Sequence, residues 1–141
     1  MSKSTKTIEF TFERTIAAAP KDAYDAWLNR EVPGTPWHES DQLILDTKVD
    51  GFFYWLVRGT AHYGRFTVLE RPGRIQHTWM SRYTLGEEST VTVSFKKKGS
   101  GTLMTLVHSG LPDHEKAKTH QDGWNYFLDA FAQQLGVAVV E

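Results

Sequence analysis

The sequence predicts an α+β fold, in which a seven-stranded antiparallel sheet wraps around one long C-terminal helix. Two observations indicate this architecture. Between Leu43 and His108 the chain is a series of short strand-like runs separated by turn residues, which is typical of an antiparallel meander. The last run leads through Pro112 into a helical pattern that ends near Gly136. Because a helix laid across a curved sheet tends to enclose a cavity, we expect the functional site to lie between the helix and the sheet.

The first third of the chain reads as strand, helix and connector. Apolar and polar residues alternate over residues 8–12, which predicts a strand with one buried face. A helix is expected from Pro20 to about Asn29, since proline is tolerated in a first helical turn and apolar residues recur at helical spacing. The Pro- and Gly-rich stretch 33–36 cannot carry a long helix, so a short turn is expected around Trp37.

Six further strands and the final helix complete the expected order. The strands are placed near residues 42–48, 52–57, 60–69, 74–81, 89–96 and 102–108. The helix should start after Pro112 with Asp113 as its N-cap and continue unbroken to Gly136. Its apolar stripe should face the sheet and consists of Ala117, His120, Trp124, Phe127, Leu128, Phe131 and Leu135.

Composition limits the classes of function. With 141 residues the chain is expected to form a single domain over residues 1–141, with a core of about residues 7–137. A net charge of −1 gives no reason to bind nucleic acid, and the Lys96-Lys97-Lys98 triplet is expected to be a solvated hairpin tip. The absence of cysteine excludes disulfides and thiolate chemistry. The N-terminus is polar and no run is long enough to span a membrane, so we expect a cytoplasmic protein with no membrane insertion.

Short signatures in a fixed order resemble one superfamily over about Phe12 to Leu135. They are APKDAYDAW at 19–27, Trp37, VDGFF at 49–53, and the segments at 64–66, 74–75, 78–79, 89–93, 101–102, 105–110 and 120–124. This order resembles START-like (SRPBCC) proteins of the type homologous to activators of the heat-shock protein 90 ATPase. The resemblance implies a helix-grip fold with two short helices after the first strand. It also implies a soluble, small-molecule-binding or chaperone-related protein, with stress response as a context.

Two positions depart from the family pattern. The family often has two glycines where this chain has Asp50-Gly51, and often an aromatic residue where this chain has His77. Aspartate tolerates positive φ better than most residues, so the turn at Asp50 should survive. The change at His77 suggests a cavity adapted to this chain.

Three histidines are the candidates for polar chemistry. His77 shares strand parity with Trp79 and should face the interior, while His108 should meet His120 at the junction of the last strand and the helix. A hydrogen-bonded structural role is the plainer interpretation of each. The three could converge on zinc, yet none has the spacing of paired metal ligands, so neither a metal nor another cofactor is expected.

Aromatic residues could line a ligand pocket or could simply form the core. Of these, Trp37, Trp79 and Phe127 should lie nearest the cavity. Gly123 is costly inside a helix, which is explained either by close packing on the sheet, the interpretation we favour here, or by space for a ligand. The candidate ligand-binding residues are Trp37, Phe53, Trp55, Phe66, His77, Trp79, Met104, His108, His120, Trp124, Phe127 and Phe131.

Three functions remain open on the sequence. The first is non-enzymatic binding of a small lipophilic or aromatic molecule in the cavity, as a monomer or homodimer. The second, implied by the resemblance, is a co-chaperone-like interaction with a heat-shock ATPase, although no separate amino-terminal module is expected. The third is a cavity enzyme of the cyclase or hydrolase type, with His77 or His120 as general base. No catalytic residue is assigned, because no nucleophile–base pattern is present.

Overall fold

In the computed structural model, which describes residues 6–140 and side chains up to residue 136, seven strands form one antiparallel sheet. The spatial order of the strands is β1-β7-β6-β5-β4-β3-β2. Every pair is antiparallel. The strands are β1 (Thr7–Ile16), β2 (Gln42–Leu45), β3 (Phe52–Val57), β4 (Thr60–Glu70), β5 (Arg74–Trp79), β6 (Ser89–Lys98) and β7 (Gly101–Pro112).

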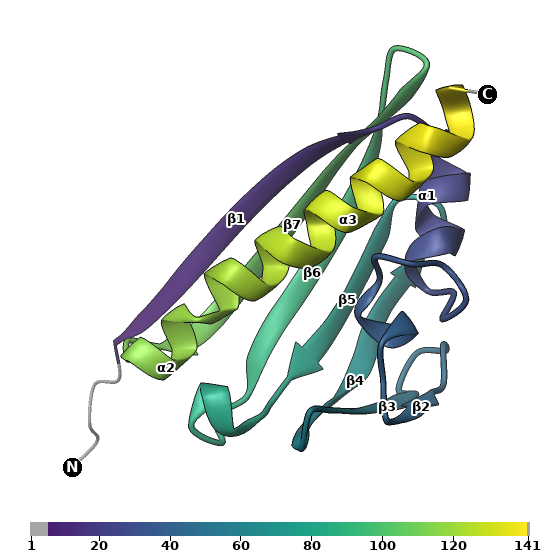
Figure 1. Ribbon diagram of the computed structural model, residues 1–141. Helices are drawn as coiled ribbons and strands as arrows, with labels where there is room; N and C mark the ends of the chain where they lie inside the picture. Colours follow the sequence, from purple (N-terminus) through teal and green to yellow (C-terminus); the bar gives the residue numbers. More distant parts are fainter. Residues whose placement is uncertain (1–5, 141) are drawn as a thin grey trace.

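Helices cover one face of this curved sheet (Figure 1). The long helix α3 (His120–Val140) crosses the face, and α1 (Pro20–Trp27) lies beside its C-terminal half. A short 3₁₀ helix, η1 (Pro36–His38), follows α1, and a second, η2 (Arg82–Thr84), connects β5 to β6. The predicted α+β architecture is confirmed, including the two short helices after the first strand. Within residues 6–140 no helix is both long enough and apolar enough to cross a bilayer.

The start of the C-terminal helix differs from the prediction. The chain forms a separate turn of helix, α2 (Glu115–Lys118), before α3 begins at His120. Asp113 is not the N-cap, because β7 is still paired with β1 at Pro112 and the chain is extended there. The cap is His114, whose Nδ1 accepts a hydrogen bond from the backbone N–H of Lys116 at 3.0 Å. The helix also extends past the predicted end at Gly136.

Strand boundaries shift for reasons of pairing. The last strand is longer than predicted, because β1 pairs with it as far as Thr7 and Pro112. The strand predicted to end at residue 48 stops at Leu45, where the chain turns back to pair Leu45 with Phe53. In that turn Asp50 has a φ of 68°, so the predicted positive-φ turn is confirmed. All three lysines of the Lys96-Lys97-Lys98 triplet are exposed, as expected.

Around its middle, at residues 125–131, α3 is packed tightly on its neighbours. Phe131 is fully buried and its ring meets Trp27 of α1 edge-on, with ring centroids 5.1 Å apart. The loop residue Gly34 lies so close that a Cβ atom there would be 2.6 Å from the backbone nitrogen of Phe131. On the opposite side, the guanidinium of Arg14 in β1 hydrogen-bonds to Asp129 and Asn125 of α3, each at 2.7 Å. These contacts fix the helix on the sheet.

Candidate functional site

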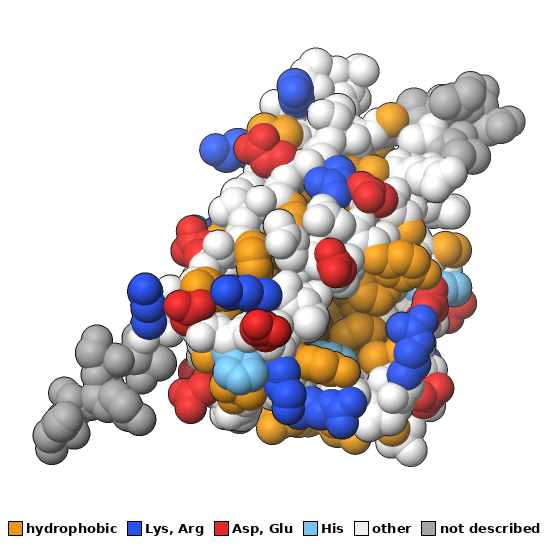
Figure 2. Space-filling view, turned by 60° about the vertical axis from the view of Figure 1, so that its left-hand side comes forward, with side chains coloured by type: hydrophobic (Ala, Val, Ile, Leu, Met, Phe, Trp, Pro, Cys, Tyr) orange, Lys and Arg blue, Asp and Glu red, His pale blue; other side chains and the backbone are white. Residues whose placement is uncertain are grey.

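A cavity of about 270 Å³ lies between the N-terminal half of α3 and strands β3, β4 and β5. In the space-filling view it is a hollow with hydrophobic side chains in its wall and basic side chains on its rim (Figure 2). Its volume is just below the roughly 300 Å³ at which drug-sized ligand sites begin. The lining residues are Pro36, Glu39, Trp55, Val57, Arg58, Thr60, His62, Trp79, Arg82, Tyr83, Thr119, His120, Gly123, Trp124 and Phe127.

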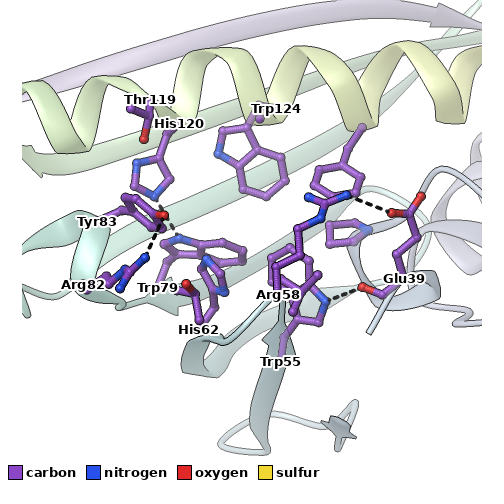
Figure 3. Close-up of a pocket in the computed structure, with 15 residues that line it drawn as sticks. Glu39, Trp55, Arg58, His62, Trp79, Arg82, Tyr83, Thr119, His120 and Trp124 are labelled. Atoms are coloured by element: carbon purple, nitrogen blue, oxygen red, sulfur yellow. Dashed lines mark hydrogen bonds and ion pairs between the residues drawn. The ribbon is translucent and has the colours of Figure 1, made fainter. Parts of the chain in front are cut away.

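The apolar walls are aromatic rings from both layers. Trp55 of β3 and Trp79 of β5 form the floor, with ring centroids 5.9 Å apart. Trp124 and Phe127 project from α3. The ring centroids of Trp124 and Trp79 are 5.2 Å apart, and those of Phe127 and Trp55 are 5.8 Å apart. Figure 3 shows the helix residues above the cavity and the sheet residues below it. Such walls suit a flat, apolar ligand, because aromatic rings stack or meet edge-on at these separations.

Hydrogen bonds between histidines and tryptophans build the inner end of the site. The indole N–H of Trp79 donates to Nε2 of His120 at 3.2 Å, and that of Trp124 donates to Nδ1 of His108 at 2.9 Å. The second ring nitrogen of His120 lies 2.7 Å from the carbonyl of Ala117. Since a carbonyl only accepts and an indole N–H only donates, His120 must carry its proton on Nδ1.

His108 is fixed in the same manner. The hydroxyl of Ser89 donates to the carbonyl of Trp79 at 2.7 Å, so Nε2 of His108, 2.8 Å away, must donate to the hydroxyl oxygen. The His108 and His120 rings meet edge-on with centroids 4.8 Å apart, as the sequence predicted. Burial lowers the pKa of both rings, and for His108 the adjacent His120 lowers it further. Both histidines are therefore neutral and their ring nitrogens are engaged.

His62 is a polar residue of the site that the sequence analysis missed. Its ring lies 4.5 Å from that of Trp55 and 6.5 Å from that of Tyr83, nearly parallel to it. Burial lowers the pKa of His62 to about 4. Among the side chains that the structure describes, the buried Nδ1 of His62 lacks a hydrogen-bond partner. The cross-strand pairing of Trp55 with His62 positions the ring, and sequence alone does not reveal that register.

Charged residues from loops form the rim. The β3–β4 hairpin turns at Arg58-Gly59 with positive φ at both positions, which is the type I′ geometry. This turn brings the guanidinium of Arg58 to 3.7 Å from the carboxylate of Glu39. At the other end of the cavity, η2 presents Arg82 and Tyr83 (Figure 3). A capping box holds η2 in place, since the Ser81 hydroxyl accepts from the N–H of Tyr83 at 3.0 Å.

The predicted ligand-binding residues separate into two groups. The cavity wall contains five of them, namely Trp55, Trp79, His120, Trp124 and Phe127. The other seven lie in the interior away from this wall, namely Trp37, Phe53, Phe66, His77, Met104, His108 and Phe131. His77 illustrates the second group: it faces inward as predicted but is only 1% exposed, and burial lowers its pKa to about 4. Its ring is surrounded by Phe53, Phe66 and Trp37.

The packing explanation for Gly123 is wrong. A Cβ atom at this position would have no described atom within 4 Å apart from its chain neighbours and the backbone of its own helix, and Gly123 lies in the cavity wall. The residues that sequence reasoning missed are Pro36, Glu39, Val57, Arg58, Thr60, His62, Arg82, Tyr83 and Thr119. Val57 shares strand parity with Trp55 and should therefore face the same side of the sheet. In the next strand, Thr60 and His62 share parity with each other for the same reason. The loop residues carry no such periodic signal. Within residues 6–140 no three His, Asp or Glu side chains lie close enough together to hold a metal ion.

The curved sheet with a long helix across its concave face defines the helix-grip class. A protein from Chromobacterium violaceum has the same fold, with a TM-score of 0.76, 21% identity, and coverage of 90% of this chain and 96% of its own. An HSP90 activator from Plasmodium falciparum superposes with a TM-score of 0.65 and 26% identity, covering 87% of this chain and 91% of its own.

The sequence matches the family described as Activator of Hsp90 ATPase homolog 1-like protein over residues 17–136, and the chain belongs to that family. The predicted resemblance is thereby confirmed. The human activator of 90 kDa heat shock protein ATPase homolog 1 is 24% identical over 131 residues, which is 92% of this chain. Those residues are 38% of the human protein, so the chain spans less than half the length of this relative.

Proposed function

We propose that the cavity under the N-terminal half of α3 binds a small lipophilic or aromatic molecule. Four aromatic rings and two neutral histidines supply apolar contact, and the rim supplies a few polar groups, which is the usual composition of a small-molecule site. The volume suits a ligand of one or two fused rings rather than a long lipid.

The observation that carries this proposal is the presence of a glycine, Gly123, where helix α3 borders the cavity. Glycine inside a helix costs about 1 kcal/mol relative to alanine, and no close contact with the sheet accounts for it. A side chain at this position would project into the cavity. Glycine therefore keeps open a space that a larger residue would fill.

The environment of the two predicted general bases favours binding over catalysis. His120 is the predicted general base that lies in the wall, yet its Nε2 accepts from Trp79 and its Nδ1–H donates to Ala117. Its lone pair is thus occupied, and a base must have a free lone pair to take a proton. His77, the other predicted base, lies outside the cavity wall.

The test is ligand-induced stabilisation with a matched pair of variants. A small neutral aromatic probe, 2-naphthol, should raise the thermal midpoint, because a free concentration at a hundredfold excess over Kd adds about 2.7 kcal/mol. Gly123→Leu should remove this shift by filling the cavity while leaving the protein folded. Gln121→Leu adds the same side chain at an exposed position of α3 and should keep the shift. Equal shifts in wild type and Gly123→Leu would reject the cavity as the binding site.

A second candidate is stimulation of a heat-shock ATPase. It is favoured by family membership and by the 26% identity to an HSP90 activator over most of this chain. The human relative is also named as such an activator, although this chain matches only part of it. Titrating the chain into a heat-shock protein 90 ATPase assay tests this function directly. A saturable rate increase supports it, whereas an unchanged rate at excess chain rejects it.

A further inference from the structure

The two ends of the cavity differ in charge. At the end nearest η1, Arg58 faces Glu39 at 3.7 Å, so its charge is partly balanced. At the end formed by η2, Arg82 donates to the hydroxyl of Tyr83 at 3.4 Å and its guanidinium carbon lies 5.2 Å from the ring centroid. Among residues 6–140 no carboxylate lies within salt-bridge distance of Arg82.

The lining residues therefore carry one more positive charge than negative, with two arginines against one glutamate. That excess is located at the η2 end. The hydrogen bond from Arg82 and its charge lower the pKa of Tyr83, with smaller contributions from Thr60 and from Lys116 of α2. Two hydroxyls in the wall, those of Thr60 and Tyr83, can donate hydrogen bonds at this end.

We propose that the ligand is a small aromatic monocarboxylate, with its ring between the tryptophans and its carboxylate on Arg82 and Tyr83. This inference rests on the proposed binding function and specifies its ligand class. A guanidinium is the side chain best matched to a carboxylate, since two parallel N–H groups can meet its two oxygens. Arg82 is exposed at the rim of the cavity, so water competes with this contact and the aromatic wall supplies most of the binding.

The ring of such a ligand would contact groups that carry no charge. Trp79 and Trp124 offer their faces and edges, while His120 and His62 are neutral because burial lowers the pKa of each. A second anionic group on the ligand would meet Glu39 at the far rim. The distribution of charge thus favours one carboxylate at one end of an otherwise apolar molecule.

The experiment compares two isosteric probes, 2-naphthoate and the neutral 2-naphthamide, by isothermal titration calorimetry at neutral pH. Wild type should bind the carboxylate about tenfold more tightly, as expected for a hydrogen bond to a charged group. Arg82→Gln should abolish this preference while retaining the amide. Arg65→Gln, at an exposed residue outside the cavity wall, should leave the preference unchanged.

Each alternative outcome has a distinct meaning. Equal affinities for the two probes in wild type would overturn the carboxylate inference and leave the proposed binding function standing. A preference that survives Arg82→Gln but is lost in Arg58→Gln would overturn the assignment of Arg82. Binding of neither probe, together with no thermal shift by 2-naphthol, would reject the proposed function itself. A preference that weakens as salt rises would support the ionic contact.

Discussion

The two halves of helix α3 face the rest of the protein in opposite ways, and two glycines show the difference. At Gly34, opposite the C-terminal half, an added Cβ would be 2.6 Å from the backbone of Phe131. At Gly123, in the N-terminal half, an added Cβ would have no described atom within 4 Å outside its chain neighbours and the backbone of its own helix. One glycine permits close packing and the other permits an empty space. The same residue type therefore anchors the helix at one end and opens a cavity beneath it at the other.

This contrast separates stability from function along a single helix. The packed half begins with the buried contact of Phe131, and Leu128 and the Arg14 pairs lie just before it. The open half rests on hydrogen bonds at its inner end, from Trp124 to His108 and from Trp79 to His120. Changes in the packed half should act mainly on folding, and changes in the open half mainly on binding.

The largest expected effect is that of Gly34→Ala. Gly34 has a φ of 98°, and its missing side chain allows direct contact with the α3 backbone. Backbone strain and overpacking should together lower the free energy of unfolding by about 3 kcal/mol or more. Denaturant unfolding measures this loss. Gly99→Ala is the matched control, since Gly99 also has positive φ, at 59°, but an open environment. If both variants lose equal stability, the loop does not pack on the helix as described.

A smaller effect should follow from acidification. Burial lowers the pKa of His62 and His77 to about 4, while an unfolded histidine titrates near 6.5. Between these values the unfolded state binds protons that the folded state does not, so stability is lost as pH falls. The two histidines together should lower the free energy of unfolding by about 2 kcal/mol between pH 6 and pH 5.

The variant His77→Phe tests the contribution of His77 to that effect. Phenylalanine keeps the contacts with the surrounding rings, and it does not titrate, so the loss of stability between pH 6 and pH 5 should shrink by about 1 kcal/mol. The remaining pH dependence comes from His62, His108 and His120, whose pKa values are also lowered by burial. Unfolding curves of wild type and variant at pH 6 and pH 5 give the comparison. In wild type, a proton NMR titration of the His77 ring should show no protonation above pH 5. An unchanged slope in the variant would show that His77 does not contribute.

The smallest effect, of opposite sign, is expected for Gly123→Ala. An alanine methyl projects into open space and restores helix propensity, so the free energy of unfolding should rise by up to about 1 kcal/mol. The same variant should weaken binding of 2-naphthol slightly, because it removes part of the cavity. Destabilisation by Gly123→Ala would mean that close neighbours surround this position and that the contrast between the halves is wrong.

The fold could be predicted from the sequence because its signals are local. Alternating residues in β1, turn residues between the strands, and the stripe along α3 each indicate an element without knowledge of the others. The errors lie where tertiary pairing decides. Pairing with β1 keeps the chain extended through Pro112 and moves the helix cap from Asp113 to His114.

The candidate site could be predicted only in part, for a physical reason. Parity shows that His77 and Trp79 both face inward, but it does not show which part of the interior is filled. His77 is enclosed by Phe53 and Phe66, whereas Trp79 borders the cavity. Arg58 and Arg82 lie on turns, where no periodicity exists and where hairpin geometry alone sets the direction of the side chain.

The placement of the tryptophans has a practical consequence. Three of the five in the chain, Trp55, Trp79 and Trp124, border the cavity, while Trp27 and Trp37 are buried elsewhere. The indoles of the three cavity tryptophans are held by hydrogen bonds to Glu39, His120 and His108, so their orientation is defined before a ligand binds. Ultraviolet emission from these rings should change when the cavity fills, and the protein thereby contains its own optical reporter of occupancy.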